Sequence, residues 1–134
     1  MRIYLAGPMR GYADFNHPAF HRATTLLRDA GHHVFSPAEH DTANGFDFTD
    51  TVGTEHELAE AGFDFRKVLN ADLSWICEEA DAVVVLPGWQ ASQGVRAEVA
   101  CALALKLPVW ELGPFLAYGA ESPFRVTWEQ VAAS

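Results

Sequence analysis

Two carboxylates stand at positions where a helix would otherwise carry an apolar stripe. Glu98 lies three residues after Val95 in "GWQASQGVRAEVACALALKLPVW", and Asp72 lies three residues after Leu69 in "FRKVLNADLSWICEEA". Residues at this spacing share one face of a helix, so both acidic side chains are expected to point along core-facing stripes. A pair of partly desolvated carboxylates is typical of sites that do acid–base or nucleophilic chemistry.

Each carboxylate also has a structural interpretation. Glu98 stands near the beginning of its predicted helix, where a negative charge stabilises the helix dipole. Asp72 has Arg66 and Arg10 as available ion-pair partners. The occurrence of both carboxylates in helices that flank the same strand favours the functional interpretation over the structural one.

Two glycine-containing turns follow predicted strands close to this pair. They read "AGPMRGY" and "GWQASQGVRAE". Ligand sites in open parallel sheets form at the carboxyl ends of the strands, which is where these turns are expected. The first turn lacks the Lys and Ser/Thr of a phosphate–magnesium loop, and a serine at the start of the later helix is also a common N-cap. The candidate binding residues in the two turns are Gly7, Arg10, Gly11, Trp89, Ser92 and Gly94.

The elements that must position these residues alternate along the chain. Apolar runs predict strands over 2–7, 32–37, 81–89 and 107–112, and helical periodicity predicts helices over 18–31, 65–80 and 92–106. A long loop is expected over 38–62 with one short helix at 55–61, and a closing helix is expected near the C-terminus. The alternation predicts an α/β fold, a single doubly wound (flavodoxin- or Rossmann-like) domain over 1–134 with a four- to five-stranded parallel sheet.

Composition narrows the classes of function. The net charge of −9 argues against a nucleic-acid polymer as partner, since such binding requires a basic face. No apolar run reaches the about 20 residues that span a bilayer, and a strand begins at once, so a cytoplasmic protein without a membrane partner is expected. The spacing of His and Cys predicts no metal site, no cofactor is expected, and Cys77 and Cys101 are expected to be buried free thiols.

Three stretches together resemble a known family. "YLAGPMRG", "NADLSWI" and "DAVVVLPGWQASQGVRAEVACALALKLPV" are similar to motifs of the nucleoside 2-deoxyribosyltransferase superfamily, and "VFSPAEHD" is similar to its short, often phage-borne, DUF4406-like branch. The resemblance covers most of residues 1–112. The superfamily also contains deoxynucleoside 5′-monophosphate N-glycosidases and a cytidine monophosphate hydrolase.

The resemblance implies roles for three residues. Glu98 matches the family nucleophile, which attacks the anomeric carbon and forms a glycosyl-enzyme intermediate. Asp72 matches the aspartate that contacts the base and donates a proton to it. Tyr4 matches the tyrosine that orients the nucleophile. The resemblance further implies a homodimer or higher homo-oligomer, because in the family the partner subunit completes each site.

The sequence departs from the nucleoside transferases at one informative position. Those enzymes carry an aspartate six residues before the nucleophile that holds a free 5′-hydroxyl, whereas this chain has Ser92. Serine at that place, together with Arg10 and Gly11, matches the nucleotide-cleaving branch, and Ser92, Gly94 and Arg10 are expected to converge on one anion site. Pro8 conflicts with this match, because that branch has a phosphate-contacting serine there.

The predicted function is therefore cleavage of the N-glycosidic bond of a (deoxy)nucleoside 5′-monophosphate through a covalent intermediate on Glu98. Two alternatives stay open: transfer of deoxyribose between bases, and a non-catalytic nucleotide sensor. The partner is a small-molecule nucleoside or nucleotide. The base, the sugar and the acceptor are not defined by these residues.

Overall fold

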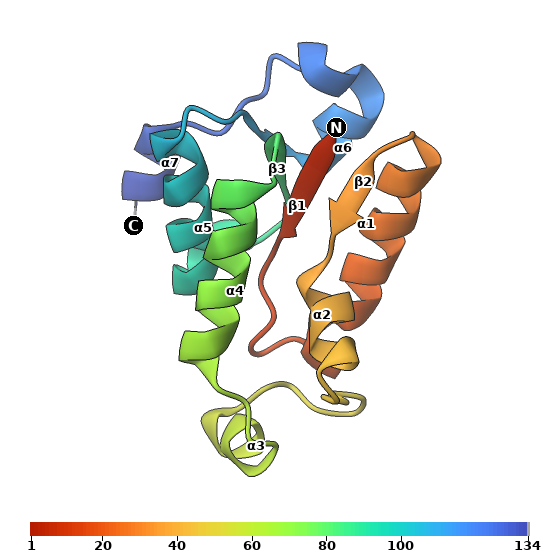
Figure 1. Ribbon diagram of the computed structural model, residues 1–134, viewed down its shortest axis with the longest axis vertical. Coiled ribbons are helices and arrows are strands. Elements are labelled where there is room, and N and C mark those ends of the chain that lie inside the picture. The colour runs from red at the N-terminus through yellow and green to blue at the C-terminus, as the bar shows by residue number, and fades with distance from the viewer. Residues whose placement is uncertain (134) are drawn as a thin grey trace.

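Four parallel strands form the centre of the molecule in the computed structural model, which describes residues 1–133 (Figure 1). The strands are β1 (Arg2–Ala6), β2 (His33–Phe35), β3 (Ala82–Val85) and β4 (Val109–Glu111). Their order across the sheet is β2-β1-β3-β4, and every neighbouring pair is parallel. The prediction of a doubly wound α/β fold with a parallel sheet is confirmed.

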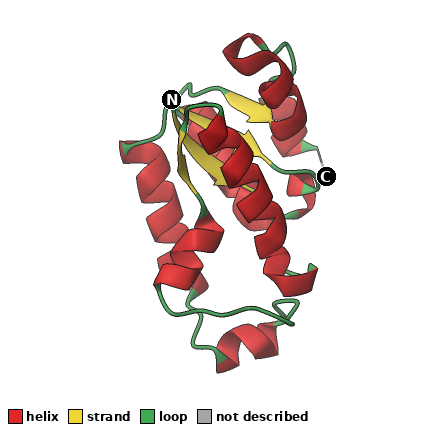
Figure 2. Cartoon of the chain, turned by 90° about the vertical axis from the view of Figure 1, so that its right-hand side faces the viewer, coloured by secondary structure: helices red, strands yellow, loops and turns green. Residues whose placement is uncertain are grey.

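Helices cover both faces of this sheet (Figures 1 and 2). One face carries α1 (His17–Asp29), α2 (Pro37–Ala43) and α6 (Leu112–Tyr118), and the other carries α4 (Phe65–Glu78), α5 (Gln93–Ala104) and α7 (Trp128–Ala132). Because both faces are covered, β3 is buried along its whole length, which explains its unbroken apolar sequence AVVV.

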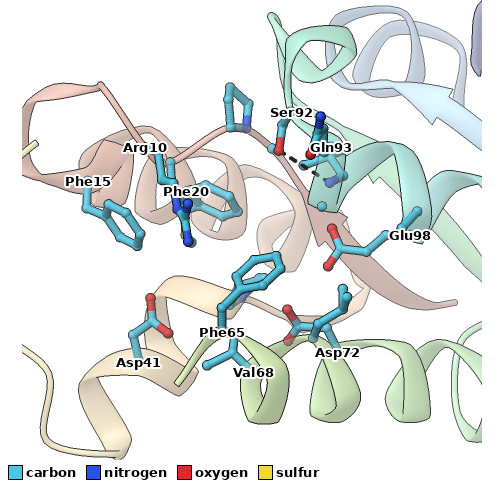
Figure 3. A pocket seen from close by; sticks show the side chains of 18 of the residues that line it. Arg10, Phe15, Phe20, Asp41, Phe65, Val68, Asp72, Ser92, Gln93 and Glu98 are labelled. Carbon is cyan, nitrogen blue, oxygen red and sulfur yellow. Dashed lines mark hydrogen bonds between the residues drawn. The ribbon is translucent and has the colours of Figure 1, made fainter. Parts of the chain in front are cut away.

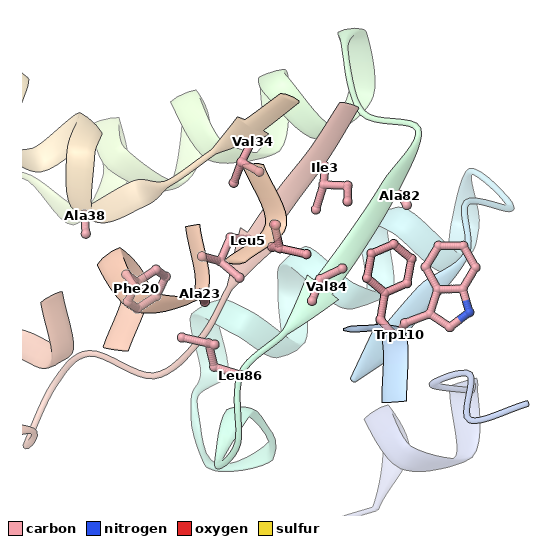
Figure 4. Close-up of a cluster of buried hydrophobic side chains, with 12 residues drawn as sticks. Ile3, Leu5, Phe20, Ala23, Val34, Ala38, Ala82, Val84, Leu86 and Trp110 are labelled. Atoms are coloured by element: carbon pink, nitrogen blue, oxygen red, sulfur yellow. The ribbon is translucent and has the colours of Figure 1, made fainter. Parts of the chain in front are cut away.

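The side chains of β1 alternate between two hydrophobic cores. Ile3 and Leu5 pack in the first core, which includes residues of α1 and α6 (Figure 4). Tyr4 and Ala6 point to the opposite face and pack in the second core, with residues of α4 and α5. This alternation directs the ring of Tyr4 toward the two helices that carry the candidate carboxylates.

The segment between α2 and α4 is held by a third, smaller cluster. The segment contains α3 (Glu55–Glu60). The buried centre of the cluster is formed by the side chains of Phe15, Phe48 and Leu58. Gly53 has a φ of +72°, and a Cβ atom there would lie 2.3 Å from the ring of Phe15. The backbone N–H of Gly11 donates to the carbonyl of Val52 at 2.6 Å, which ties this segment to the turn after β1.

The helices differ from prediction in two places. The prediction of a loop over 38–62 is wrong at its start. Pro37, which was expected to end a strand, also begins α2. Proline is preorganised for the first turn of a helix, where its missing N–H is not needed. The short helix expected at 55–61 is present as α3, whereas α6 was not predicted.

The two cysteines are free, but the expectation that both are buried is wrong. Cys77 is exposed and Cys101 is partly exposed, with their Sγ atoms 3.6 Å apart. Ile76 occupies the core position of α4, so the next residue is turned about 100° away from the core. No helix among residues 1–133 is long and apolar enough to cross a membrane.

Candidate active site

A pocket of about 560 Å³ opens beyond the carboxyl end of β1, between α4, α5 and the turn after β1 (Figure 3). This volume lies within the range of pockets that take small ligands. Apolar and aromatic side chains make most of the wall, and three carboxylates interrupt it. The lining residues used below are Tyr4, Gly7, Pro8, Arg10, Phe15, Phe20, Asp41, Phe63, Phe65, Asp72, Ser92, Gly94 and Glu98.

Glu98 is held on the pocket wall by the packing of α5. Val95 and Val99, which flank it in the helix, are buried in the second core, and Glu98 itself is only 6% exposed. The hydroxyl of Tyr4 donates a hydrogen bond to Oε2 of Glu98 at 2.5 Å. Because Tyr4 is fully buried in β1, this contact fixes the carboxylate against the sheet.

Asp72 faces Glu98 from α4 (Figure 3). It is 5% exposed, and its Oδ1 atom is buried without a hydrogen-bond partner. Leaving a buried polar atom unpaired costs stability, and such atoms call for an explanation, of which a catalytic role is one. The structural interpretation loses support, because no Lys, Arg or His among residues 1–133 forms an ion pair with Asp72 or Glu98.

The pKa values of the two carboxyls are shifted together. Burial raises the pKa of Glu98 well above its ordinary value, and the neighbouring Asp72 raises it further. Burial also raises the pKa of Asp72 to about 7. Groups that interact so closely titrate as a pair, so a proton held between them belongs to both carboxyls.

Tyr4 influences where that proton resides. Burial raises the pKa of Tyr4 well above its ordinary value, so its hydroxyl remains a donor. Its hydrogen bond lowers the pKa of Glu98 and so opposes the effect of burial. Tyr4 lowers the pKa of Asp72 as well, and the contact between the two carboxyls raises the pKa of Glu98 and lowers that of Asp72. The arrangement can therefore present a carboxylate and a carboxylic acid side by side.

The residues of the expected anion site all line the pocket. Ser92 is the N-cap of α5, and its Oγ accepts from the backbone N–H of Val95 at 3.3 Å. Gly94 follows in the first turn of the helix. Within the described residues Arg10 is the only lysine or arginine in the wall, and its guanidinium lies over the ring of Phe65 at 5.1 Å. Figure 3 shows Ser92 toward the Glu98 end and Arg10 toward the Asp41 end.

The remaining predicted binding residues divide between wall and scaffold. Gly7 lines the pocket where its backbone packs closely against Leu86. A Cβ atom at this position would lie 2.8 Å from the Leu86 side chain. Gly11 does not line it and instead joins the turn to residue 52 through its backbone. The prediction of Trp89 as a binding residue is not supported, because its indole is 1% exposed and packs in the second core. An apolar ring of this size is stabilised more by the core than by a wet pocket.

Sequence reasoning missed one prominent member of the wall. Asp41 lies on α2 and is 2% exposed, and its Oδ2 atom accepts a hydrogen bond from Nε2 of His17 at 3.2 Å. A signal for it existed in "SPAEHD", where a proline begins a short helix and the aspartate lies four residues later on the same face. Among residues 1–133 no group of His, Cys, Asp and Glu is arranged to hold a metal ion.

Comparison with known proteins identifies a family but no activity. The sequence profile of one family, described as a domain of unknown function (DUF4406), matches residues 1–111. The match therefore includes Tyr4, Asp72 and Glu98. No curated protein matches the chain.

Proposed function

This chain belongs to the DUF4406 family, and we propose that it cleaves the N-glycosidic bond of a (deoxy)nucleoside 5′-monophosphate. The observation that carries the proposal is the buried pair of Glu98 and Asp72, with Tyr4 donating to Glu98, on the wall of a pocket of about 560 Å³. The resemblance of these residues to the nucleoside 2-deoxyribosyltransferase superfamily supports the same chemistry.

In the first step the carboxylate of Glu98 attacks the anomeric carbon of the sugar. A bond forms between this carbon and a carboxylate oxygen while the bond from the carbon to the base nitrogen breaks. The proton held by Asp72 passes to the leaving base, which departs neutral. The negative charge of Glu98 also stabilises the oxocarbenium-like transition state, and its low-dielectric surroundings strengthen this effect.

In the second step water resolves the intermediate. Asp72, now ionised, accepts a proton from the water as its oxygen bonds to the anomeric carbon. The bond from that carbon to Glu98 breaks, and the sugar phosphate leaves. Both carboxyls return to their starting states, so no other reactant is required.

The phosphate is proposed to bind at the N-terminus of α5. Unpaired backbone N–H groups and the positive end of the helix dipole favour an anion there, and Ser92 carries a hydroxyl at that point. Arg10, whose guanidinium lies over the Phe65 ring next to Gly94, is the only cationic side chain of the pocket wall within residues 1–133 and would have to reach toward the helix end to meet the phosphate. A local cation matters more in this chain than in a neutral one, because its net charge of −9 opposes the approach of an anion.

Incubation with matched nucleosides and 5′-monophosphates, followed by chromatography of the released base, tests the proposal. We expect base release from a monophosphate, and a mass increase equal to the sugar phosphate less one water on the peptide that carries Glu98. Exchange of an added second base, with little hydrolysis, would instead support the transferase alternative. Tight binding of one ligand without release or exchange would support the sensor.

A homo-oligomer is part of the proposal, since in the resembling family the partner subunit completes each site. Large apolar side chains near the C-terminus support an interface there: Tyr118 is 60% exposed, Phe124 56% and Trp128 53%. Ser122 lies in the same region but is buried, and its Oγ accepts a hydrogen bond from the backbone N–H of Phe124 at 3.3 Å. Sedimentation velocity measures the oligomeric state directly.

A further inference from the structure

The end of the pocket opposite Glu98 carries a third buried carboxylate, Asp41 (Figure 3). Catalysis as proposed above uses Glu98, Asp72 and Tyr4, and phosphate binding uses the N-terminus of α5. Neither requires Asp41. An acidic side chain that is 2% exposed in a mostly apolar wall therefore needs its own explanation.

Asp41 is held in one orientation by its neighbours. Nε2 of His17 donates to its Oδ2 atom at 3.2 Å, and Phe48 packs edge-on against His17. Among residues 1–133 no Lys or Arg pairs with Asp41. One carboxylate oxygen is thus occupied by His17, and Oδ1 makes no side-chain hydrogen bond in the described part of the chain. A fixed acceptor with a free oxygen is suited to reading a donor on a ligand.

Aromatic rings connect this end to the catalytic end. Phe20 and Phe65 lie along the pocket between Asp41 and the Glu98–Asp72 pair, and Phe15 lies at the Asp41 end (Figure 3). Flat aromatic surfaces of this kind bind a planar ring system by stacking. A base whose glycosidic nitrogen lies beside Asp72 would extend past these rings and bring its far edge toward Asp41.

We infer that Asp41 is a specificity-determining residue that accepts a hydrogen bond from the exocyclic amino group of the base, so that the site selects 6-aminopurine or 4-aminopyrimidine nucleotides over their oxo counterparts. The inference rests on the proposed function for the placement of the sugar. The carboxylate of Asp41 would attract an amino group of the base and would repel a carbonyl oxygen at the same position. His17 acts as a positioning residue, because its N–H occupies the other oxygen.

Matched nucleotides isolate this contact. Deoxyadenosine and deoxyinosine monophosphates differ only at one edge of the base, where an amino group beside an unprotonated ring nitrogen is replaced by a carbonyl beside a ring N–H. The deoxycytidine and deoxyuridine monophosphates differ in the same way in the pyrimidine series. In wild type we expect kcat/KM to favour the amino member of at least one pair by roughly tenfold or more, because the oxo member leaves the buried carboxylate unpaired. Equal or reversed preference in both pairs would overturn the inference.

Asp41→Asn is the informative variant. The amide oxygen still accepts from His17, so the fold is preserved, while the amide nitrogen offers a donor where the base requires an acceptor. We expect the amino-to-oxo ratio to fall to about one or below it. Glu39→Gln is the matched control, since Glu39 is also on α2 but faces solvent and pairs with Arg28 at 2.6 Å. An unchanged ratio in Asp41→Asn would contradict the role, as would the same change in both variants.

A binding measurement separates this inference from the proposed function. Calorimetry of the four nucleotides with Glu98→Gln, alone and combined with Asp41→Asn, reports recognition without turnover. Absence of cleavage in wild type together with tighter binding of the amino members would reject the N-glycosidase and leave the role of Asp41 standing. Absence of both cleavage and binding would reject both.

Discussion

The two ends of the pocket are built from different kinds of structure. At the Glu98 end, the side chains that are proposed to react come from β1, α4 and α5, which are packed in the second core. At the Asp41 end, the wall comes from the seven-residue helix α2 and the 3-10 turn Ala13–Asn16. Asp14, Phe15 and Asn16 of that turn have φ values of 54°, 55° and 60°, which side chains other than glycine adopt at some cost.

This difference suggests that the two ends of the pocket have different roles. A carboxylate that must meet an anomeric carbon has to be held closely, and sheet-packed elements provide that rigidity. Recognition of the base edge requires only an acceptor at the correct distance, so loops and short helices suffice. Changes at the Asp41 end are therefore expected to alter which substrate is used, whereas changes at the Glu98 end are expected to alter whether it reacts.

Glu98→Gln gives the largest expected effect. The amide cannot act as the nucleophile, so the rate of base release should fall by roughly 10³-fold or more while the fold is retained. Chromatography of released base measures this loss, and Glu78→Gln, an exposed change on α4, serves as the control. Normal turnover in Glu98→Gln would show that Glu98 is not the nucleophile. The assignment of the reaction to this end of the pocket would then fail.

Asp72 should also make stability depend on pH. Its carboxyl has a pKa of about 7 in the folded protein against an ordinary value of 3.8, so the folded state keeps a proton that the unfolded state releases between these values. The stability that this proton provides is present below about pH 4 and is lost as the pH rises to about 7. Relative to Asp72→Asn, wild type should lose up to about 4 kcal/mol across this window, since one pKa unit corresponds to about 1.4 kcal/mol.

Urea unfolding at pH 4.5 and pH 8 measures this difference, with the exposed Asp29→Asn as control. The difference should be confined to the Asp72 variant. A parallel pH dependence of wild type and Asp72→Asn would show that the carboxyl is not protonated in the folded protein, and would remove it as the proton donor.

Ser92→Asp tests the phosphate at the catalytic end. A carboxylate at the N-terminus of α5 would repel a 5′-phosphate, so kcat/KM for the monophosphate should fall by roughly a hundredfold while that for the nucleoside is retained. Arg10→Ala should reduce the same preference by roughly tenfold, the value of a hydrogen bond to a charged group. If wild type instead prefers the bare nucleoside, the phosphate interpretation fails. Pro8, which stands where the nucleotide-cleaving branch has a phosphate-contacting serine, is then the informative residue, and the transferase alternative is favoured.

Gly53→Ala gives the smallest expected effect and sharpens the comparison. The new methyl group would lie 2.3 Å from Phe15, so this ring must move, and KM should rise several-fold while the rate of the covalent step is unchanged. Gly45→Ala is the matched control: Gly45 also has a positive φ, +87°, but no atom lies within 4 Å of the added methyl. Both variants should lose roughly 1–2 kcal/mol of stability from backbone strain, and only Gly53→Ala should change KM. A slower covalent step in Gly53→Ala would show that the two ends are not independent.

Much of the scaffold of the catalytic end was predictable. The apolar stripes of α4 and α5 made Asp72 and Glu98 conspicuous, because a carboxylate on a core-facing stripe violates a strong local regularity. The Asp41 end was not predictable in the same way. The polar segment 38–62 has weak periodicity, and α2 is too short to show an apolar repeat, so only the proline before it indicated a helix.

The sequence by itself determined the parallel α/β fold and the two helices that carry the carboxylates, since both follow from periodicities within single segments. Only the tertiary structure decided that Trp89 packs in the core and that Asp41 joins the pocket. Likewise, the hydrogen bond from Tyr4 to Glu98 joins residues 94 positions apart in the chain. Contacts of that separation depend on strand order and helix packing, which no local pattern of residues encodes.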